Sequence, residues 1–198
     1  MSRSERSITT AQLLQKIGAW RSPIFMVDRI EDFVPGEKGN IVVAKHVTFN
    51  EPYIEAHFPG NPVMPGVMIA EIFGQASEYF SLLDDFCRAY AQASNQALKK
   101  GDDICRALST PEGEKIILQE RERIAGFLAA QDLKFKKVVY PGDTIRVESA
   151  LSFSDVHGFH HYKVEARVGR HVVAEGKVIN FRAERETIIA RKSSGVSR

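Results

Sequence analysis

The feature that most constrains this chain is the segment 67–83, which is apolar on nearly every side. Its few polar side chains include Glu71, Gln75 and Glu78, which are spaced by four and then three residues and so share one helix face. A helix that is apolar nearly all round must be buried. The polar stripe could simply face solvent, but Glu71 is flanked on both sides by apolar residues. We therefore expect other elements to wrap around one central helix that carries a partly buried carboxyl.

Segments with the composition of β-strands lie on both sides of this helix. Tight turns separate the later ones, so we expect an antiparallel sheet. The expected strands are 24–34, 41–49, 127–138, 144–154, 159–168 and 171–182, and a short helix over 9–19 precedes them. Six strands and one buried helix predict an α+β fold in which the sheet wraps around the helix.

The length and composition of the chain fit one such domain. The 198 residues are 43% hydrophobic and 26% charged, which is ordinary for a globular protein. We expect a single domain over 1–198, with a helical insertion at about 84–126 and a polar C-terminal tail from about 183. The insertion is charge-rich and weakly apolar, which is typical of a surface extension.

Charge and cysteine content exclude several classes of function. A net charge of +2 gives no global nucleic-acid footprint, and no stretch approaches the roughly 18 apolar residues of a membrane span. Cys87 and Cys105 form neither a metal-ligand pattern nor a disulfide framework, which fits a reducing compartment. We therefore expect a cytoplasmic protein that neither binds nucleic acid nor inserts into membranes.

A loop rich in proline and glycine leads directly into the central helix. The stretch 57–66 holds three prolines and two glycines, which excludes a helix or a central strand. His57 opens this loop, and Pro65 suits the first turn of the helix, where a missing N–H costs nothing. A lone loop histidine is more often structural than catalytic, but this one is followed at once by a helix that carries a carboxyl.

His57, Glu71 and the start of the helix together suggest acid–base chemistry. Apolar surroundings should raise the pKa of Glu71 toward a value suited to donating a proton. The helix start, near Gly66 and Val67, offers free N–H groups and a partial positive charge. A base, an acid and an anion-stabilising helix end are what proton abstraction beside a carbonyl requires. Gln75, one turn after Glu71, can hydrogen-bond it or a nearby backbone group.

The stretch 50–75, NEPYIEAHFPGNPVMPGVMIAEIFGQ, resembles the signature of the (3R)-hydroxyacyl-[acyl-carrier-protein] dehydratases of bacterial type II fatty-acid synthesis. The segments 20–30 and 132–143 resemble that family's first strand and its third strand with the following turn. The resemblance covers about 12–83 and 125–182, and it implies a hot-dog fold. Glutamate at position 71 matches the broad-specificity branch, whereas the branch that also isomerises the double bond carries aspartate there.

The resemblance also implies a mechanism. His57 would take the α-proton of the 3-hydroxyacyl thioester, and Glu71 would protonate the departing hydroxyl, directly or through a water. The N–H of Gly66, with Val67 beside it, would polarise the thioester carbonyl. Neither a metal nor an organic cofactor would be needed. In the family the histidine and the acid meet across a dimer interface, so the chain would form homodimers with shared sites, with a trimer of dimers as a further option.

The resemblance makes an acyl carrier protein the expected partner. Carrier proteins are acidic, so the mouth of the acyl tunnel along the central helix should be basic. Lys134 and Lys136 point to one face of a predicted strand, and Lys137 follows them. Three lysines on an edge strand could instead only keep that edge soluble and unpaired.

The chain departs from the family in two places. The region 84–126 is longer than expected, and Val138 stands where many members have proline. We expect the extension to lie beside the tunnel mouth and to affect chain-length preference or assembly. Three histidines gather around the turn at Gly158: His157, His160 and His161. No cysteine or paired acid accompanies them in the sequence, so we expect them to be surface residues and not metal ligands.

Three alternative functions stay open. The same dehydration could serve polyketide, polyene or lipid-precursor synthesis. An acyl thioesterase shares the fold but usually lacks the loop that begins at His57. A non-catalytic acyl-binding protein is also compatible with the fold, although the joint presence of His57 and Glu71 argues against it.

Overall fold

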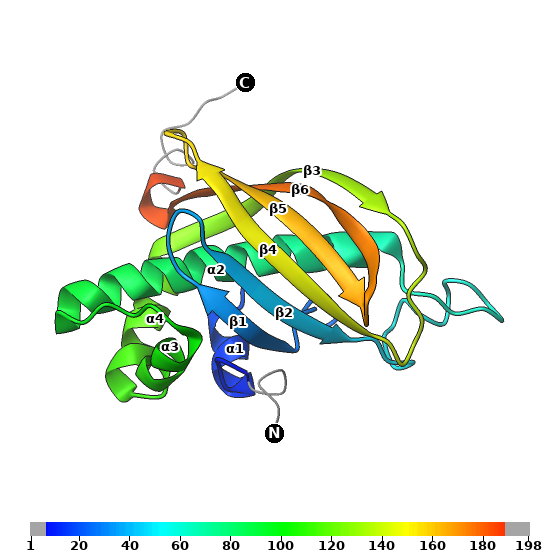
Figure 1. The fold of residues 1–198 in the computed structure, drawn as a ribbon, viewed down its shortest axis with the longest axis horizontal. Coiled ribbons are helices and arrows are strands. Elements are labelled where there is room, and N and C mark those ends of the chain that lie inside the picture. Colours follow the sequence, from blue (N-terminus) through cyan, green and yellow to red (C-terminus); the bar gives the residue numbers. More distant parts are fainter. Residues whose placement is uncertain (1–6, 189–198) are drawn as a thin grey trace.

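The computed structural model describes residues 7–188 and contains a six-stranded antiparallel sheet curved around one long helix (Figure 1). The strands are β1 (Arg29–Val34), β2 (Asn40–His46), β3 (Ile124–Phe135), β4 (Thr144–Ser154), β5 (Phe159–Val168) and β6 (His171–Glu184), in the order β1-β2-β4-β5-β6-β3. The central helix α2 spans Gly66–Ser94 and is accompanied by α1 (Ala11–Ile17), α3 (Gly101–Leu108) and α4 (Pro111–Arg123). The predicted α+β architecture is confirmed.

The first strand is shorter than predicted, because its first residues are bound to the helix instead. β1 begins at Arg29 and not near Ile24. The backbone N–H groups of Ile24 and Phe25 both donate to the carbonyl oxygen of Arg21, at 2.9 and 3.1 Å. The Ile24 carbonyl and the Met26 N–H are then bound by a side chain of α2. The sheet therefore starts only after this segment has crossed the helix.

The N-terminal half of α2 is buried except along one flank. Ile72, Phe73 and Ala76 are fully buried against the sheet. The flank that stays partly exposed faces β3, and Met68 beside it also keeps some exposure. The Gln131 side chain of β3 donates to the Ala70 carbonyl at 2.9 Å, which holds the strand against this flank. The flank consists of Val67, Ala70, Glu71, Gly74 and Glu78.

The insertion differs from the predicted surface extension. α2 continues to Ser94, so the beginning of the range 84–126 is part of the central helix. α4 packs against α2, and α3 packs against α4 and β1, at the opposite end of the molecule from the loop that precedes α2 (Figure 1). Ile104 and Ile117 are fully buried in the same core as α2. These two helices therefore contribute to the core and are not a purely surface extension, whereas their expected position beside the tunnel mouth stays a prediction.

The last strand is slightly longer than predicted. β6 runs to Glu184, two residues past its predicted end, and the rest of the predicted polar tail from residue 189 onward lies outside the described residues. Within the described range 7–188, no helix is both long and apolar enough to cross a membrane.

Candidate active site

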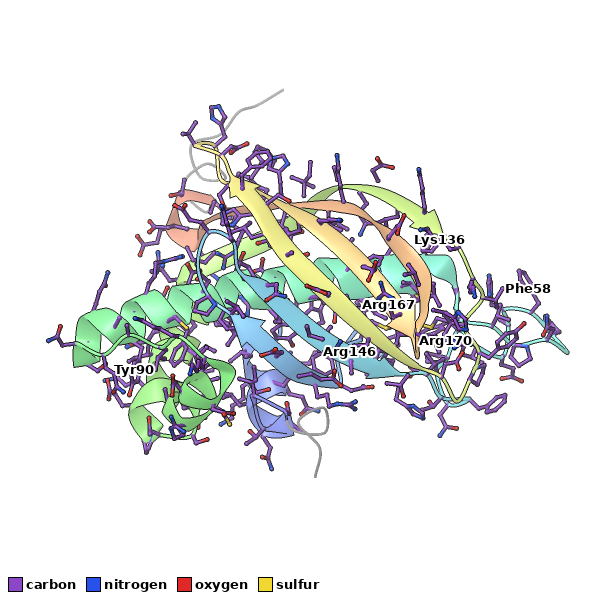
Figure 2. All side chains as sticks on the ribbon, viewed as in Figure 1. Phe58, Tyr90, Lys136, Arg146, Arg167 and Arg170 are labelled. Atoms are coloured by element: carbon purple, nitrogen blue, oxygen red, sulfur yellow. The ribbon has the colours of Figure 1, made fainter. Side chains whose placement is uncertain are left out.

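The loop before α2 is an ordered turn that opens at His57. The His57 N–H donates to the Ile54 carbonyl at 3.1 Å, and the Val63 N–H donates back to the His57 carbonyl at 2.7 Å. The ring of Phe58 stacks on the imidazole with a centroid distance of 4.1 Å. The loop projects at one end of the molecule, where Phe58 is labelled (Figure 2).

The imidazole of His57 is oriented by a backbone carbonyl. Its Nδ1 lies 3.2 Å from the carbonyl oxygen of Val63. A carbonyl can only accept a hydrogen bond, so Nδ1 carries the proton and Nε2 has its lone pair available. The structure therefore holds His57 in the tautomer that can act as a base through Nε2.

Gln75 holds the carboxyl of Glu71 in place. Its Nε2 donates to Glu71 Oε1 at 2.8 Å and to the Ile24 carbonyl at 2.6 Å, while its Oε1 accepts from the Met26 N–H at 3.0 Å. Gln75 is fully buried, so these bonds are protected from water. The predicted hydrogen bond to Glu71 and the predicted backbone contact are both present. Glu71 itself is half-buried and turns toward the open flank of α2.

The start of α2 presents unpaired backbone donors. Pro65 is the N-cap, and its carbonyl accepts from the N–H groups of Met68 and Ile69 at 3.0 and 3.4 Å. Within residues 7–188 the N–H groups of Gly66 and Val67 have no backbone acceptor. A Cβ at Gly66 would lie 3.3 Å from the ring of Phe135, so glycine lets this ring approach the helix start closely. Val67 is 73% exposed.

His57 and Glu71 are not bonded to one another in a single chain. The described residues place His57 against Val63 and Glu71 against Gln75, with no hydrogen bond or ion pair between the two. The flank that carries Glu71 borders the edge strand β3, whose Phe127 and Phe135 are about half exposed, at 53% and 50%. An edge strand with large exposed apolar side chains is a surface that proteins usually cover.

The three lysines after and within β3 differ in their surroundings. β3 ends at Phe135, so Lys136 and Lys137 follow the strand, and both backbone N–H groups bond to the Val173 carbonyl. Lys136 forms an ion pair with Glu175 at 2.6 Å, which lowers the pKa of Glu175. Lys137 Nζ lies 3.0 Å from Nδ1 of His171. Lys134 lies on the outer face of the sheet and lines a shallow groove there.

The sequence reasoning missed two arginines near these lysines. Arg167 and Arg170 lie with Lys136 toward the end of the molecule at which the loop bearing Phe58 projects (Figure 2). Arg167 is paired with Glu165 at 2.5 Å. The signal that could have identified them is the predicted turn at 169–170, which puts both arginines at a strand end.

The histidines near Gly158 separate into two environments. His161 stacks on Phe153 at 4.1 Å on the outer face. His160 points inward, with Nδ1 at 3.5 Å from Ser81 Oγ, and its burial together with nearby Arg182 lowers its pKa. The prediction of surface residues is therefore wrong for His160. In the part of the chain that is described, no group of histidine, cysteine or acidic side chains has the geometry of a metal site.

Comparison with known proteins yields one family. Residues 20–119 match the model of the FabA-like domain. The 3-hydroxyacyl-[acyl-carrier-protein] dehydratase FabZ of Geotalea uraniireducens is 34% identical over 141 residues, which cover 71% of this chain and 74% of that protein. The FabZ dehydratase of Ligilactobacillus salivarius is 37% identical over 138 residues, which cover 70% of this chain and 74% of that protein.

A solved structure with the same fold is the dehydratase heterocomplex ApeI:P from Xenorhabdus doucetiae. It aligns with a TM-score of 0.58 and 10% identity, over 90% of this chain and 96% of that chain. The predicted hot-dog fold is thereby confirmed. Because the family model matches half of the chain and FabZ relatives match over most of its length, this protein belongs to the FabA-like family.

Proposed function

We propose that this protein dehydrates (3R)-3-hydroxyacyl-[acyl-carrier-protein] to trans-2-enoyl-[acyl-carrier-protein] in fatty-acid or related lipid or polyketide synthesis. It is a hydro-lyase, as its curated FabZ relatives are by name. The observation that carries the proposal is that Val63 orients His57 as a base, Gln75 positions the carboxyl of Glu71, and the helix start between them in the sequence has N–H groups without a backbone acceptor among the described residues.

His57 is the base. Its Nδ1–H bonds to the Val63 carbonyl, which leaves Nε2 to accept the α-proton of the substrate. As that proton leaves, negative charge develops on the thioester oxygen. The N–H groups of Gly66 and Val67 stabilise this charge, because they have no other backbone acceptor and lie at the positive end of α2.

Glu71 is the acid. Gln75 binds its Oε1 and leaves the other carboxyl oxygen toward the open flank of α2. Glu71 donates a proton to the 3-hydroxyl, the bond from C3 to oxygen breaks, and water leaves as the double bond forms between C2 and C3. The base has then gained one proton and the acid has lost one, and exchange with solvent restores both.

Each active site is built from two chains. Support for this comes from the separate partners of His57 and Glu71 within one chain and from the exposed apolar side chains of the edge strand β3. A second copy that covers β3 would bring its own His57 toward Glu71. The assembly is a homodimer, with a trimer of such dimers as its larger form.

The acyl carrier protein docks on the basic end of the sheet. Lys134 and Lys137 are the exposed lysines there that form no ion pair with a carboxylate among the described residues, whereas Lys136 is engaged by Glu175. Exposed charges of this kind mainly set the rate of association with an acidic partner. We also assign the protein to the cytoplasm, since its buried Cys87 and its Cys105 are both free thiols.

One assay separates this function from its alternatives. The pure protein is incubated with (3R)-3-hydroxydecanoyl-carrier protein, and the carrier-bound product is examined by intact mass spectrometry. Loss of the mass of one water supports the dehydratase. Release of the free acid, leaving an unloaded carrier protein, would identify a thioesterase instead. An unchanged substrate that still co-elutes with the protein would identify an acyl-binding protein.

A further inference from the structure

A strip of partly exposed helix surface leads from Glu71 along α2. Gly74 and Glu78 follow on the same flank, so Glu78 lies about 10 Å further along the helix axis. An added Cβ at Gly74 would meet only the Leu128 side chain, at 3.8 and 3.9 Å. The glycine therefore leaves the helix surface bare between the two carboxyls, and a chain that passes Glu71 can lie along it.

The strip ends at three polar side chains. Asn180 and Arg182 lie on the inner face of β6 and pair across the ladder with Leu128 and Gly126 of β3. Asn180 is 2% exposed, and the Arg182 side chain is 6% exposed. Asn180 Nδ2 contacts the Gly74 carbonyl at 3.5 Å, which puts this amide beside the strip.

Glu78 closes the strip against β3. A Cβ at Gly126 would come within 2.1 Å of the Glu78 carboxylate, so the carboxylate occupies the space that glycine leaves. Its Oε2 lies 3.3 Å from Arg182 Nε, close enough for an ion pair but without hydrogen-bond geometry.

These three side chains contain buried polar atoms that form no hydrogen bond within residues 7–188, although Glu78 Oε2 and Arg182 Nε face each other as an ion pair. Among the residues described, four buried side-chain atoms lack a hydrogen bond, and three of them lie here: Asn180 Oδ1, Glu78 Oε2 and Arg182 Nε. Buried polar groups are normally hydrogen-bonded, so such a concentration points to a group that is received at this place. An alkyl chain end would leave all three atoms without a hydrogen bond.

The charges favour a neutral ligand group over an anion. Arg182 already faces two carboxylates, since its Nη1 donates to Asp85 at 2.8 Å in addition to the ion pair with Glu78. Burial raises the pKa of Glu78, against the opposing effects of Arg182 and Arg121, so negative charge is already disfavoured here. A hydroxyl suits the site, because it donates to an acceptor such as Asn180 Oδ1 and accepts from a donor such as Arg182 Nε–H.

We propose that the acyl chain of the preferred substrate carries a second hydroxyl, distal to the 3-hydroxyl, and that Asn180 and Arg182 bind it at the end of the strip, beside Glu78. This inference rests on the proposed dehydration and names the substrate class for the same site. A reaction that supplies this substrate must therefore leave a hydroxyl near the far end of the growing chain.

The test compares matched pairs of carrier-bound substrates. Each pair is a 3-hydroxyoctanoyl, 3-hydroxydecanoyl or 3-hydroxydodecanoyl chain and its analogue with a hydroxyl on the terminal carbon. At one of these lengths the terminal hydroxyl should raise kcat/KM about three- to tenfold, the factor expected for one net hydrogen bond, and should do so mainly through KM. Equal kcat/KM within every pair overturns the proposal.

Asn180→Leu, which is similar in size, should remove this preference and raise the turnover of the unsubstituted chain. The matched control is Ser77→Ala, which deletes another buried hydrogen bond of α2, between Ser77 and Ser149 at 2.9 Å, and should leave the preference unchanged. A preference that survives Asn180→Leu also overturns the proposal.

Gly74→Ala keeps the proposal testable even where Asn180→Leu does not fold. Alanine favours the helix, so the melting temperature should not fall, but its methyl group narrows the strip. The kcat/KM of the decanoyl chain should drop relative to that of 3-hydroxybutyryl-carrier protein, and an unchanged ratio would show that the chain does not follow the strip. Failure of the wild-type protein to dehydrate any of these carrier-bound substrates, the 3-hydroxybutyryl one included, would overturn the proposed function instead.

Discussion

Gln75 links the carboxyl of Glu71 to the segment before β1, so its replacement affects both stability and activity. Gln75→Leu leaves the buried Met26 N–H without a partner and breaks the hydrogen bond to the carbonyl of Ile24, which is an exposed residue. An unsatisfied buried donor costs about 1–3 kcal/mol and a lost hydrogen bond about 0.5–1.5 kcal/mol, so we predict a loss of roughly 2–4 kcal/mol in the free energy of unfolding. Urea denaturation measures this loss, with the exposed Gln119→Leu as the control. A loss below about 0.5 kcal/mol, the size of an ordinary surface substitution, would contradict the account.

His160 should make the fold sensitive to mild acid. Its burial, with Arg182 nearby, lowers its pKa in the folded state, so the unfolded chain takes up a proton first as pH falls. The contribution of neutral His160 to stability is complete above the unfolded pKa of about 6.5 and is lost as pH falls through the lowered folded pKa. His160→Gln should therefore show a smaller decrease in the free energy of unfolding between about pH 7.5 and pH 5. Denaturation curves that change in parallel for wild type and variant would refute this, and exposed His157→Gln is the control.

At this scale the sequence could predict local partners but not distant ones. The hydrogen bond between Gln75 and Glu71 follows from their spacing of four residues on a helix. Nothing in the sequence indicates that Gln75 also binds the backbone at Ile24 and Met26, because those contacts depend on how the chain crosses the helix. The contact of Glu78 with Arg182 depends on the packing of α2 against β6, and nothing in the sequence indicates it.

At the scale of elements, α4 tests the corrected description of the insertion. Ile117 is fully buried in the main core, so Ile117→Ala should lower the free energy of unfolding by about 2–5 kcal/mol. The exposed Lys115→Ala, on the same helix, should change it by less than about 0.5 kcal/mol. Thermal or urea denaturation checks both. Equal, small effects would mean that α4 is after all a surface addition.

The lysines at the end of β3 provide a second test at this scale. A Lys134→Glu, Lys137→Glu double variant should raise KM for carrier-bound substrate, with kcat largely kept, because exposed charges act mainly on association. The increase should shrink as salt is added. Turnover of a short thioester without the carrier serves as the control and should barely change. Equal losses with both substrates would show that these lysines support the fold and that docking occurs elsewhere.

Strands and helices were predictable from periodicity, but their ends depended on tertiary contacts. β4 and β5 have the predicted bounds, because turns flank them on both sides in the sequence. β1 begins later than predicted, since the side chain of Gln75 binds the residues before it. The burial of α3 and α4 was missed because their few apolar residues, such as Ile104 and Ile117, are scattered among charges and share a face only once the helices are formed.

At the scale of the whole molecule, the order of the strands places β3 at the edge of the sheet, beside the candidate active site. β3 follows the insertion in sequence but lies at the edge of the sheet beside β6, next to the flank of α2 that carries Glu71. Its exposed Phe127 and Phe135 make this edge the natural place for a second copy. The sequence predicted the pair His57 and Glu71, but a single chain leaves them with separate partners.

The most direct measurement is the rate of water loss from 3-hydroxyacyl-carrier protein by four samples: wild type, His57→Ala, Glu71→Gln, and an equal mixture of the two variants after subunit exchange. Each variant alone should be slower by about 10²–10⁴ while keeping its circular dichroism spectrum. The mixture should recover about a quarter of wild-type activity. About half of the dimers then hold one chain of each variant, and each of these contains one intact and one doubly altered site. Near-normal turnover by either variant, or no recovery despite proven exchange, would contradict the account.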